Sequence, residues 1–158
     1  MSTTFESWDD ENLDLNINLL RGVYSYGFEK PSPIQKKAII PILNKKDVIA
    51  QAQSGTGKTG AFTVSVLQSI DPDINSTQAI IMSPTRELSK QIYDVVNSIG
   101  YLLKYNTCLM IGGTSIDEQI KECKENPPKI IVGCPGRIFD LLCRRVIDAN
   151  TVKILAID

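Results

Sequence analysis

The sequence predicts a single α/β domain with a mainly parallel sheet and helices on both faces of that sheet. Its 158 residues match the usual size of one domain, and 42% of them are hydrophobic, which is enough for one core. Five short apolar runs mostly lack the polar alternation of half-exposed strands, so they indicate strands covered on both faces. Segments of helix length lie between these runs, and this alternation favours right-handed crossovers between parallel strands.

The N-terminal part of the chain predicts a polar leader and two short helices. Residues 1–12 are polar and rich in acids, so we expect a flexible leader there and the domain itself over 13–158. Apolar residues then recur at helical spacing from Leu15 until Gly27. The same spacing returns after Pro33, which predicts a second helix.

The rest of the chain alternates between predicted strands and helices. The first apolar run, 47–52, leads into a glycine-rich stretch and is predicted as the first strand. Further strands are predicted at 79–82, 108–111, 130–132 and 152–157. Helices are predicted at 58–70, 86–103, 115–124 and 135–145. This order indicates one domain without an internal repeat.

Composition and charge exclude several classes of protein. Seventeen Lys and Arg residues against eighteen Asp and Glu give a formal net charge of −1, so no global positive field attracts nucleic acid or a membrane. Any phosphate binding must therefore be local. The chain has no histidine, which excludes Ser-His and Cys-His catalysis and the common zinc sites.

The cysteines and the N-terminal sequence indicate an intracellular protein. The four cysteines form no C-x-x-C pair and are expected as reduced thiols; they are Cys108, Cys123, Cys134 and Cys143. No apolar stretch approaches the roughly 20 residues that span a bilayer, and the first residues do not resemble a secretion signal. We expect no membrane partner and a cytoplasmic location, with the nucleus as the alternative.

A candidate phosphate-binding loop follows the first predicted strand and opens the next predicted helix. Its residues are Ala52, Gln53, Ser54, Gly55, Thr56, Gly57, Lys58 and Thr59. Glycines let the backbone turn tightly and direct successive N–H groups inward, which creates an anion-binding nest at a helix N-terminus. Lys58 is expected to meet the β- and γ-phosphates, and the Thr59 hydroxyl to ligate magnesium. The general pattern has glycine in place of Ala52, and the alternative is a glycine turn beside a surface lysine.

A second candidate segment, residues 27–35, lies upstream of this loop. A glutamine amide such as that of Gln35 can donate to adenine N7 while it accepts from the N6 amino group, a pairing that guanine cannot satisfy. Phe28 can offer its ring face to a base. Taken alone, a glutamine on a helix and a phenylalanine in a loop are more often structural.

Together these patterns resemble the first RecA-like domain of a DEAD-box RNA helicase over residues 8–158. The motifs that carry the resemblance are 27–35, 52–59, Pro84-Thr85-Arg86-Glu87-Leu88 with Gln91, Gly112-Gly113, Pro135-Gly136-Arg137 and Leu155-Ala156-Ile157-Asp158. In helicases the phosphate loop begins with alanine, so Ala52 matches the family. Residues 19–24 and 47–51 are similar to the translation initiation factor 4A type within that family.

The resemblance implies roles in nucleotide binding. Gln35 and Phe28 would hold adenine with Lys30 nearby, and the loop through Gly60 would hold the phosphates of ATP. Asp158 would be the first letter of the Asp-Glu-Ala-Asp box, on the strand that bears the magnesium-coordinating acid. The candidate catalytic residues are Lys58 and Asp158, and the candidate magnesium ligands are Thr59 and Asp158.

The resemblance also implies an RNA-binding surface. The candidate contacts are Pro84, Thr85, Arg86, Gly112, Gly113, Pro135, Gly136 and Arg137. Backbone N–H groups at glycines and fork-shaped arginine donors bind phosphate without regard to base sequence, and they need no net basic charge. The alternative for each of these residues, taken separately, is a solvated helix start or a turn.

Three features depart from the family pattern. Cys134 stands where the family has threonine, so a hydroxyl donor is replaced by a weaker thiol donor, which predicts reduced RNA affinity. Trp8 takes the place of an upstream aromatic residue but at a longer spacing from Gly27. The sequence stops at Asp158, before the glutamate that activates water, the Ser-Ala-Thr motif and the second domain. We therefore expect a piece of a longer protein whose sheet lacks a central strand. The strands on either side of the missing one would keep unpaired backbone groups, so the chain alone is expected to be poorly stable.

The sequence thus predicts part of the first domain of an ATP-dependent RNA helicase. ATP, magnesium, RNA, a second RecA-like domain of the same protein and possible protein activators are the expected cofactors and partners. ATP and RNA would close the two domains, a short duplex would open, and hydrolysis would reset the cycle. The chain by itself is expected to be inactive. The alternatives are an ATP-gated RNA clamp or scaffold without processive unwinding, and a P-loop ATPase that does not bind RNA.

Overall fold

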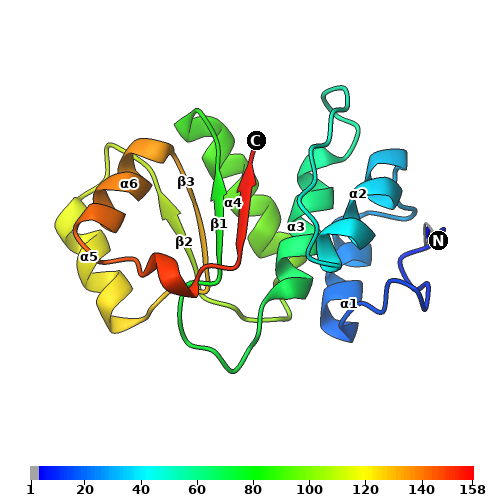
Figure 1. Ribbon diagram of the computed structural model, residues 1–158, viewed down its shortest axis with the longest axis horizontal. Coiled ribbons are helices and arrows are strands. Elements are labelled where there is room, and N and C mark those ends of the chain that lie inside the picture. The colour runs from blue at the N-terminus through cyan, green and yellow to red at the C-terminus, as the bar shows by residue number, and fades with distance from the viewer. Residues whose placement is uncertain (1–3) are drawn as a thin grey trace. The chain divides into compact units, whose positions relative to one another are not determined.

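The computed structural model describes residues 4–158 (Figure 1). Its elements in chain order are α1 (Ile17–Tyr26), α2 (Pro33–Leu43), α3 (Lys58–Ser69), β1 (Ala79–Met82), α4 (Arg86–Ile99), β2 (Thr107–Met110), α5 (Ile116–Glu125), β3 (Ile130–Gly133), α6 (Pro135–Cys143), a 3₁₀ turn (Ala149–Thr151) and β4 (Ile154–Ile157). The chain divides into two compact units. The first comprises 1–69 and 95–104, and the second comprises 70–94 and 105–158.

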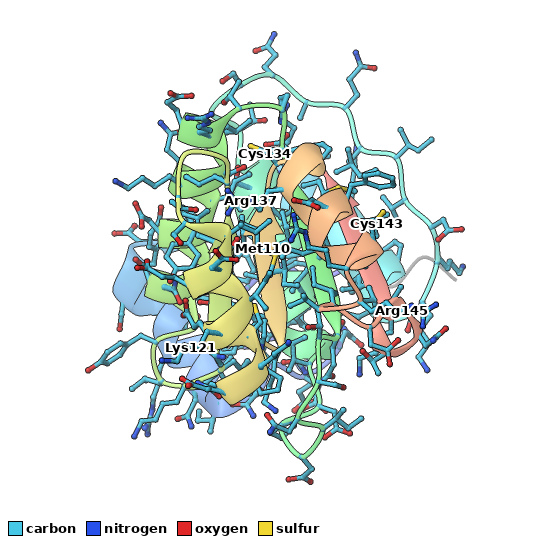
Figure 2. The ribbon with its side chains drawn as sticks, turned by 90° about the vertical axis from the view of Figure 1, so that its left-hand side faces the viewer. Met110, Lys121, Cys134, Arg137, Cys143 and Arg145 are labelled. Atoms are coloured by element: carbon cyan, nitrogen blue, oxygen red, sulfur yellow. The ribbon has the colours of Figure 1, made fainter. Side chains whose placement is uncertain are left out.

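The second unit contains an all-parallel sheet with the strand order β2-β3-β1-β4. In the register of this sheet, Ile80 of β1 lies beside Ile131 of β3 on one side and beside Leu155 of β4 on the other. The side chains of Ile80 and Ile131 join the buried cluster that contains Met110 and Leu141. Figures 1 and 2 show α5 and α6 over this face, with Met110 beneath them, and the beginning of α4 on the opposite side.

Both faces of the central strands are buried, as the uninterrupted apolar runs predicted. Ile81 points away from the cluster around Ile80, because successive side chains of a strand face opposite sides, and it is also fully buried. Ile130 and Val132 of β3 are buried in the same way. The predicted fold class, an α/β domain with a parallel sheet and helices on both faces, is confirmed.

The strand predicted at 47–52 is wrong. Residues 46–53 belong to no helix or strand, and Ile49 is fully exposed. A strand forms only where a neighbour pairs with its backbone N–H and C=O groups. No strand in residues 4–158 pairs with this segment, and the outer edge of β4 has no partner among those residues either. The apolar run therefore lacks the neighbour that would turn it into a strand.

Residues 1–12 were expected to form a flexible leader, and from residue 4 onward the structure differs from this expectation. Phe5 and Trp8 are fully buried, and their ring centroids lie 6.0 Å apart. The Trp8 ring also stacks on Phe28, with centroids 6.1 Å apart and planes inclined by 17°. Two aromatic side chains bury enough apolar surface to hold an otherwise polar segment in place. The domain boundary expected after residue 12 stays a prediction.

Local signals in the sequence account for the first two helices. The side chain of Asn16 accepts from the backbone N–H of Asn18 at the start of α1, and Gly27 ends that helix in the left-handed conformation at φ 103°. Ser32 and Gln35 form a capping box at the start of α2, where Pro33 occupies the first helical position. None of the helices in the part of the chain described here has the length and apolar composition that crossing a membrane requires.

Candidate functional site

The candidate phosphate-binding loop lies in the first unit, directly before α3. Gly55 and Gly57 have φ values of 81° and 97°, a left-handed conformation that side chains disfavour, so the predicted tight turn is present. Lys58 is the first residue of α3, and Thr59 follows it in the first helical turn. Both side chains are half-buried. The first turn of a helix has backbone N–H groups without helical partners, which is the arrangement that binds phosphate.

Gln35 lies against this loop rather than apart from it. The residue is only 2% exposed. Its amide oxygen accepts a hydrogen bond from the backbone N–H of Ser32 at 2.8 Å, and its amide nitrogen donates to the carbonyl of Gly57 at 3.2 Å. The amide therefore joins the start of α2 to the phosphate loop. These two bonds leave one lone pair on the amide oxygen and one hydrogen on the amide nitrogen, which is the pair of groups that adenine needs. Adenine recognition by Gln35 stays a prediction.

Phe28 packs onto the same loop. A Cβ atom added to Gly60 would lie 2.7 Å from both the Phe28 ring and the Gln35 amide nitrogen, and one added to Gly57 would lie 2.7 Å from that nitrogen. A side chain at either position would have to displace these neighbouring groups. The structure thus brings together Phe28, Gln35 and the glycine loop, as the sequence predicted, whereas Lys30 is exposed in the connection between α1 and α2.

Asp158 belongs to the second unit. It directly follows β4, and its backbone N–H donates to the carbonyl of Met82 at 2.9 Å, which continues the pairing of β4 with β1. Its side chain is exposed. Thr59 and Asp158, the two candidate magnesium ligands, therefore belong to different units, and their joint role stays a prediction.

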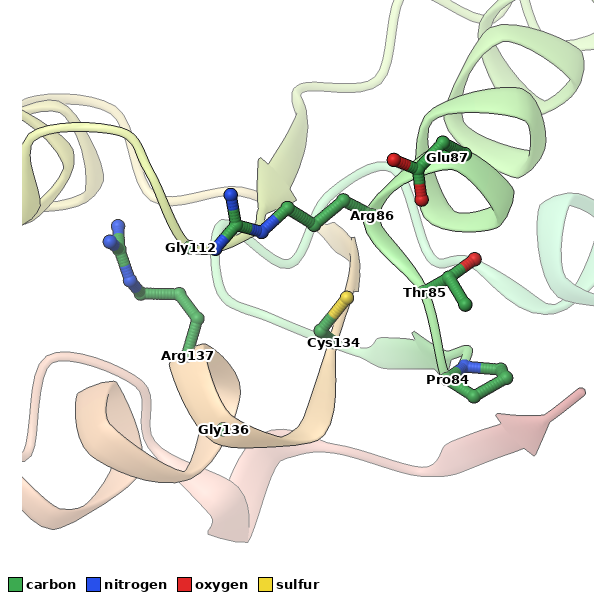
Figure 3. Close-up of a pocket in the computed structure, with 8 residues that line it drawn as sticks. All are labelled: Pro84, Thr85, Arg86, Glu87, Gly112, Cys134, Gly136 and Arg137. Carbon is green, nitrogen blue, oxygen red and sulfur yellow. The ribbon is translucent and has the colours of Figure 1, made fainter.

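The candidate RNA contacts converge on one open pocket of about 530 Å³ in the second unit, which we call the arginine pocket (Figure 3). Its lining residues are Pro84, Thr85, Arg86, Glu87, Gly112, Cys134, Gly136 and Arg137. Six of the eight predicted contacts are in this lining, and Gly113 and Pro135 adjoin it in the sequence. The pocket lies where β1, β2 and β3 end, which is the edge of a parallel sheet at which ligands bind in α/β folds.

The glycine pair provides space for Arg86. A Cβ atom at Gly112 would lie 3.1 Å from Nη2 of Arg86, and one at Gly113 would lie 2.9 Å from Nη1. Gly113 also has a φ of 87°, which a side chain disfavours. The guanidinium group therefore lies over bare backbone, and Figure 3 shows it beside Gly112. The pair is therefore more than a turn, because its lack of side chains also leaves room for the Arg86 guanidinium group.

Arg137 reaches toward the same loop from the other side. Its Nη1 donates to Oγ1 of Thr114 and to Oε1 of Gln119, both at 3.1 Å, and its Nη2 donates to the carbonyl of Thr114 at 2.8 Å. Neither Thr114 nor Gln119 belongs to the motifs from which the RNA contacts were predicted. Gln119 is a buried polar residue on the otherwise amphipathic α5, and no local pattern relates it to a residue on α6.

Two helices begin at the pocket and direct their N-termini there. Thr85 Oγ1 accepts from the backbone N–H of Leu88 and thereby caps α4. Cys134 is the N-cap residue of α6, but its side chain makes no capping hydrogen bond. Its Sγ lies 3.5 Å from Oγ of Ser89, which in turn lies 2.5 Å from Oγ of Ser83. The predicted weak thiol donor therefore lies in the wall of the pocket, and reduced RNA affinity stays a prediction.

The other cysteines lie away from this pocket. Cys108 of β2 and Cys123 of α5 are buried in the same cluster, Cys143 is exposed, and all four thiols are free. The neighbouring Cys123 thiol and burial hold the pKa of the Cys108 thiol well above its ordinary value. In residues 4–158, no three His, Cys, Asp or Glu side chains are grouped so that they could hold a metal ion.

Comparisons with known proteins agree with this geometry. The sequence profile of the family described as DEAD/DEAH box helicase matches residues 32–158. The chain is 49% identical over 155 residues to "ATP-dependent RNA helicase eIF4A" of Chaetomium globosum, and the match covers 98% of this chain and 38% of that protein.

Solved structures are similar over the same region. A structure of Dbp5 from S. cerevisiae, bound to RNA and ADP BeF3, matches with a TM-score of 0.86 and 38% identity over 98% of this chain and 38% of that one. A DEAD box protein from the hyperthermophile Methanococcus jannaschii matches with a TM-score of 0.90 and 34% identity over 99% of this chain and 42% of that one. The chain thus spans less than half the length of these relatives.

Proposed function

Since the chain belongs to the DEAD/DEAH box helicase family, we propose that it provides the ATP- and RNA-binding N-terminal domain of an ATP-dependent RNA helicase of the initiation factor 4A type. The family match also confirms the RecA-like fold class. The observation that carries the proposal is the arginine pocket, because residues from three separate motifs meet there without any net basic charge of the chain. Such a protein takes part in translation initiation, so we further propose that it acts in the cytoplasm.

ATP would bind at the phosphate loop. The N–H groups of the loop, the Lys58 ammonium and the first turn of α3 would hold the phosphates. Magnesium fits a donor set of one hydroxyl and one carboxylate, because it usually keeps waters and substrate phosphates as its other ligands. Thr59 and Asp158 would hold it, and it would neutralise charge on the phosphates. Gln35 would select adenine through the amide hydrogen and the lone pair that its present bonds leave available.

RNA would bind through its backbone at the arginine pocket. The N-termini of α4 and α6, the backbone at Gly112 and the guanidinium groups of Arg86 and Arg137 all favour phosphate oxygens. None of them distinguishes one base from another, which suits an enzyme that acts on many RNAs. The relative from S. cerevisiae was solved with RNA and ADP BeF3, which supports both ligands for this chain.

The helicase activity would require a second RecA-like domain beside this one. Closure of two domains on ATP and RNA would open a short duplex, and hydrolysis would release the strand. Protein activators that favour this closure stay a prediction. An ATP-gated RNA clamp would use all of these residues. It would differ from a helicase because it stays bound to RNA after ATP hydrolysis.

Fluorescent ATP binding tests the nucleotide site in the full chain. Lys58→Ala should weaken binding at least about tenfold, because it removes a charge-assisted contact to phosphate. Lys37→Ala is the matched control, since Lys37 is an exposed lysine of α2 in the same unit and should have no effect. Equal affinities for the Lys58 variant and the unmodified chain would refute the proposed nucleotide site.

RNA-stimulated ATP hydrolysis tests the helicase function in a protein that joins this domain to a second RecA-like domain. Arg86→Ala and Arg137→Ala should each reduce the stimulation by RNA and leave the basal hydrolysis rate intact. Stimulation that persists in both variants would favour a phosphate-loop ATPase that does not bind RNA.

A further inference from the structure

We propose that Gln119 is a positioning residue for RNA binding, which fixes the guanidinium group of Arg137 in the arginine pocket while leaving its positive charge uncompensated. The inference rests on the proposed function and adds to it a residue that does not itself contact RNA. The juxtaposition that carries it is the set of three hydrogen bonds from Arg137 to Gln119 and Thr114.

All three acceptors of Arg137 are neutral oxygens. They are a threonine hydroxyl, a backbone carbonyl and an amide carbonyl. The ion pairs in residues 4–158 do not include Arg137, and Glu87, an acidic residue in the pocket lining, is not among its partners. Arg144, just after α6, differs in this respect, since its Nε lies 2.9 Å from the Asp140 carboxylate. Arg137 is therefore held in place without being neutralised, which leaves its full charge available to a phosphate.

The hydrogen bonds also leave donors available. A guanidinium group has five N–H donors, and the three bonds use both hydrogens of Nη1 and one of Nη2. The Nε–H and the second hydrogen of Nη2 remain for a ligand. An arginine fixed in this way can donate to a phosphate without first losing the freedom of its long side chain, and this preorganisation increases affinity.

Gln119 is itself rigidly held. It is 8% exposed and lies in the first turn of α5, which Ser115 caps. Its Nε2 donates to the carbonyl of Leu109 in β2 at 2.8 Å, and this bond determines which end of the amide is the oxygen that faces Arg137. The position of Arg137 thus depends on a strand, through one buried amide. Sites supported by such buried hydrogen bonds are more precise than sites on loops alone.

Binding of a labelled single-stranded uridine oligonucleotide to the full chain, measured by fluorescence anisotropy, tests the proposal. Arg137→Ala should weaken binding about tenfold. It should also reduce the slope of log K against the logarithm of the salt concentration by about 0.7, because one phosphate contact is lost. Gln119→Leu should weaken binding about fivefold, because Arg137 keeps its charge but loses its fixed position. In the double variant, the loss should equal that of Arg137→Ala alone, since Gln119 acts only through Arg137.

Gln78→Leu is the matched control. Gln78 is a buried glutamine before β1, and its amide nitrogen donates to the backbone carbonyls of Asp71 and Ile74. Its loss should destabilise the fold but leave the RNA affinity of the folded protein unchanged. If Gln119→Leu does not fold, Thr114→Val removes another acceptor of Arg137 from an exposed position and should weaken binding about threefold.

The outcomes separate this inference from the function on which it rests. If Arg137→Ala weakens binding and Gln119→Leu does not, the positioning role is wrong and the RNA site stands. A further loss on adding Gln119→Leu to Arg137→Ala would also overturn the positioning role, as would an equal loss in Gln78→Leu. If none of the variants changes RNA binding, both the positioning role and the RNA site are wrong.

Discussion

At the scale of the residue, Arg86 and Arg137 meet in one pocket, where both guanidinium groups can donate to phosphate. Their orientation depends on Gly113 and Gln119, which act through contacts between segments distant in the chain. A motif describes neighbours along the sequence, so it contains no information on such contacts.

Cys134 provides a test at this scale. It has the extended backbone of an N-cap residue, with φ −91° and ψ 148°, but its thiol makes no capping bond. Cys134→Ser should supply an oxygen for the free N–H groups of the first turn of α6 and raise the free energy of unfolding by about 1 kcal/mol. Thermal denaturation measures this gain.

The control for that variant is Cys143→Ser at the other end of α6. The exposed Cys143 is the last residue of the helix, where a hydroxyl does not cap N–H groups. It should leave the melting temperature within error of the unmodified chain. The capping argument fails if the two variants shift the melting temperature equally.

At the scale of the element, all six predicted helices are present, and side chains cap the starts of four of them, α1, α2, α4 and α5. Helices form from local bonds, so a local pattern suffices to predict them. Strands depend on neighbours, and residues 47–52 show the consequence. Residues 48–50 are apolar like the strands that do form, but no strand among residues 4–158 pairs with them.

Gly22 tests how closely two elements of the first unit approach. It is buried on α1, and a Cβ atom there would lie 1.8 Å from the backbone carbonyl oxygen of Ile99 at the end of α4. Backbone cannot move aside as a flexible side chain can. Gly22→Ala should therefore lower the free energy of unfolding by about 3 kcal/mol or more, as measured by urea denaturation.

Ser25→Ala is the matched control, because Ser25 is exposed on the same helix. It should be neutral or slightly stabilising, since alanine has the higher helix propensity. Equal stability of the Gly22 variant and this control would show that the two backbones do not meet.

At the scale of the whole molecule, the free edge of the sheet determines the behaviour of the chain in solution. Leu155 and Ile157 of β4 are 55% and 73% exposed, and the outer backbone groups of this strand have no strand partner in residues 4–158. Exposed apolar edge strands pair readily with other chains. Unpaired backbone groups of this kind were expected from the sequence, and the poor stability of the isolated chain stays a prediction.

We expect the chain to self-associate through β4 as its concentration rises. Ile157→Lys should reduce this association, because a charged side chain on an edge strand opposes pairing. Sedimentation velocity over a range of concentrations measures the effect. Tyr101→Lys is the control, since Tyr101 is 76% exposed but lies on no strand, and it should leave the association unchanged. A chain that stays monomeric at all concentrations would contradict this account of the edge.

Because Ser32 and Gly57 hold the Gln35 amide in place, its remaining hydrogen and lone pair keep a fixed direction. A purine that paired with them would therefore cost little rotamer entropy of the side chain, whereas a freely rotating glutamine would lose that freedom on capture. Inorganic triphosphate, which has no base, would not gain from this arrangement.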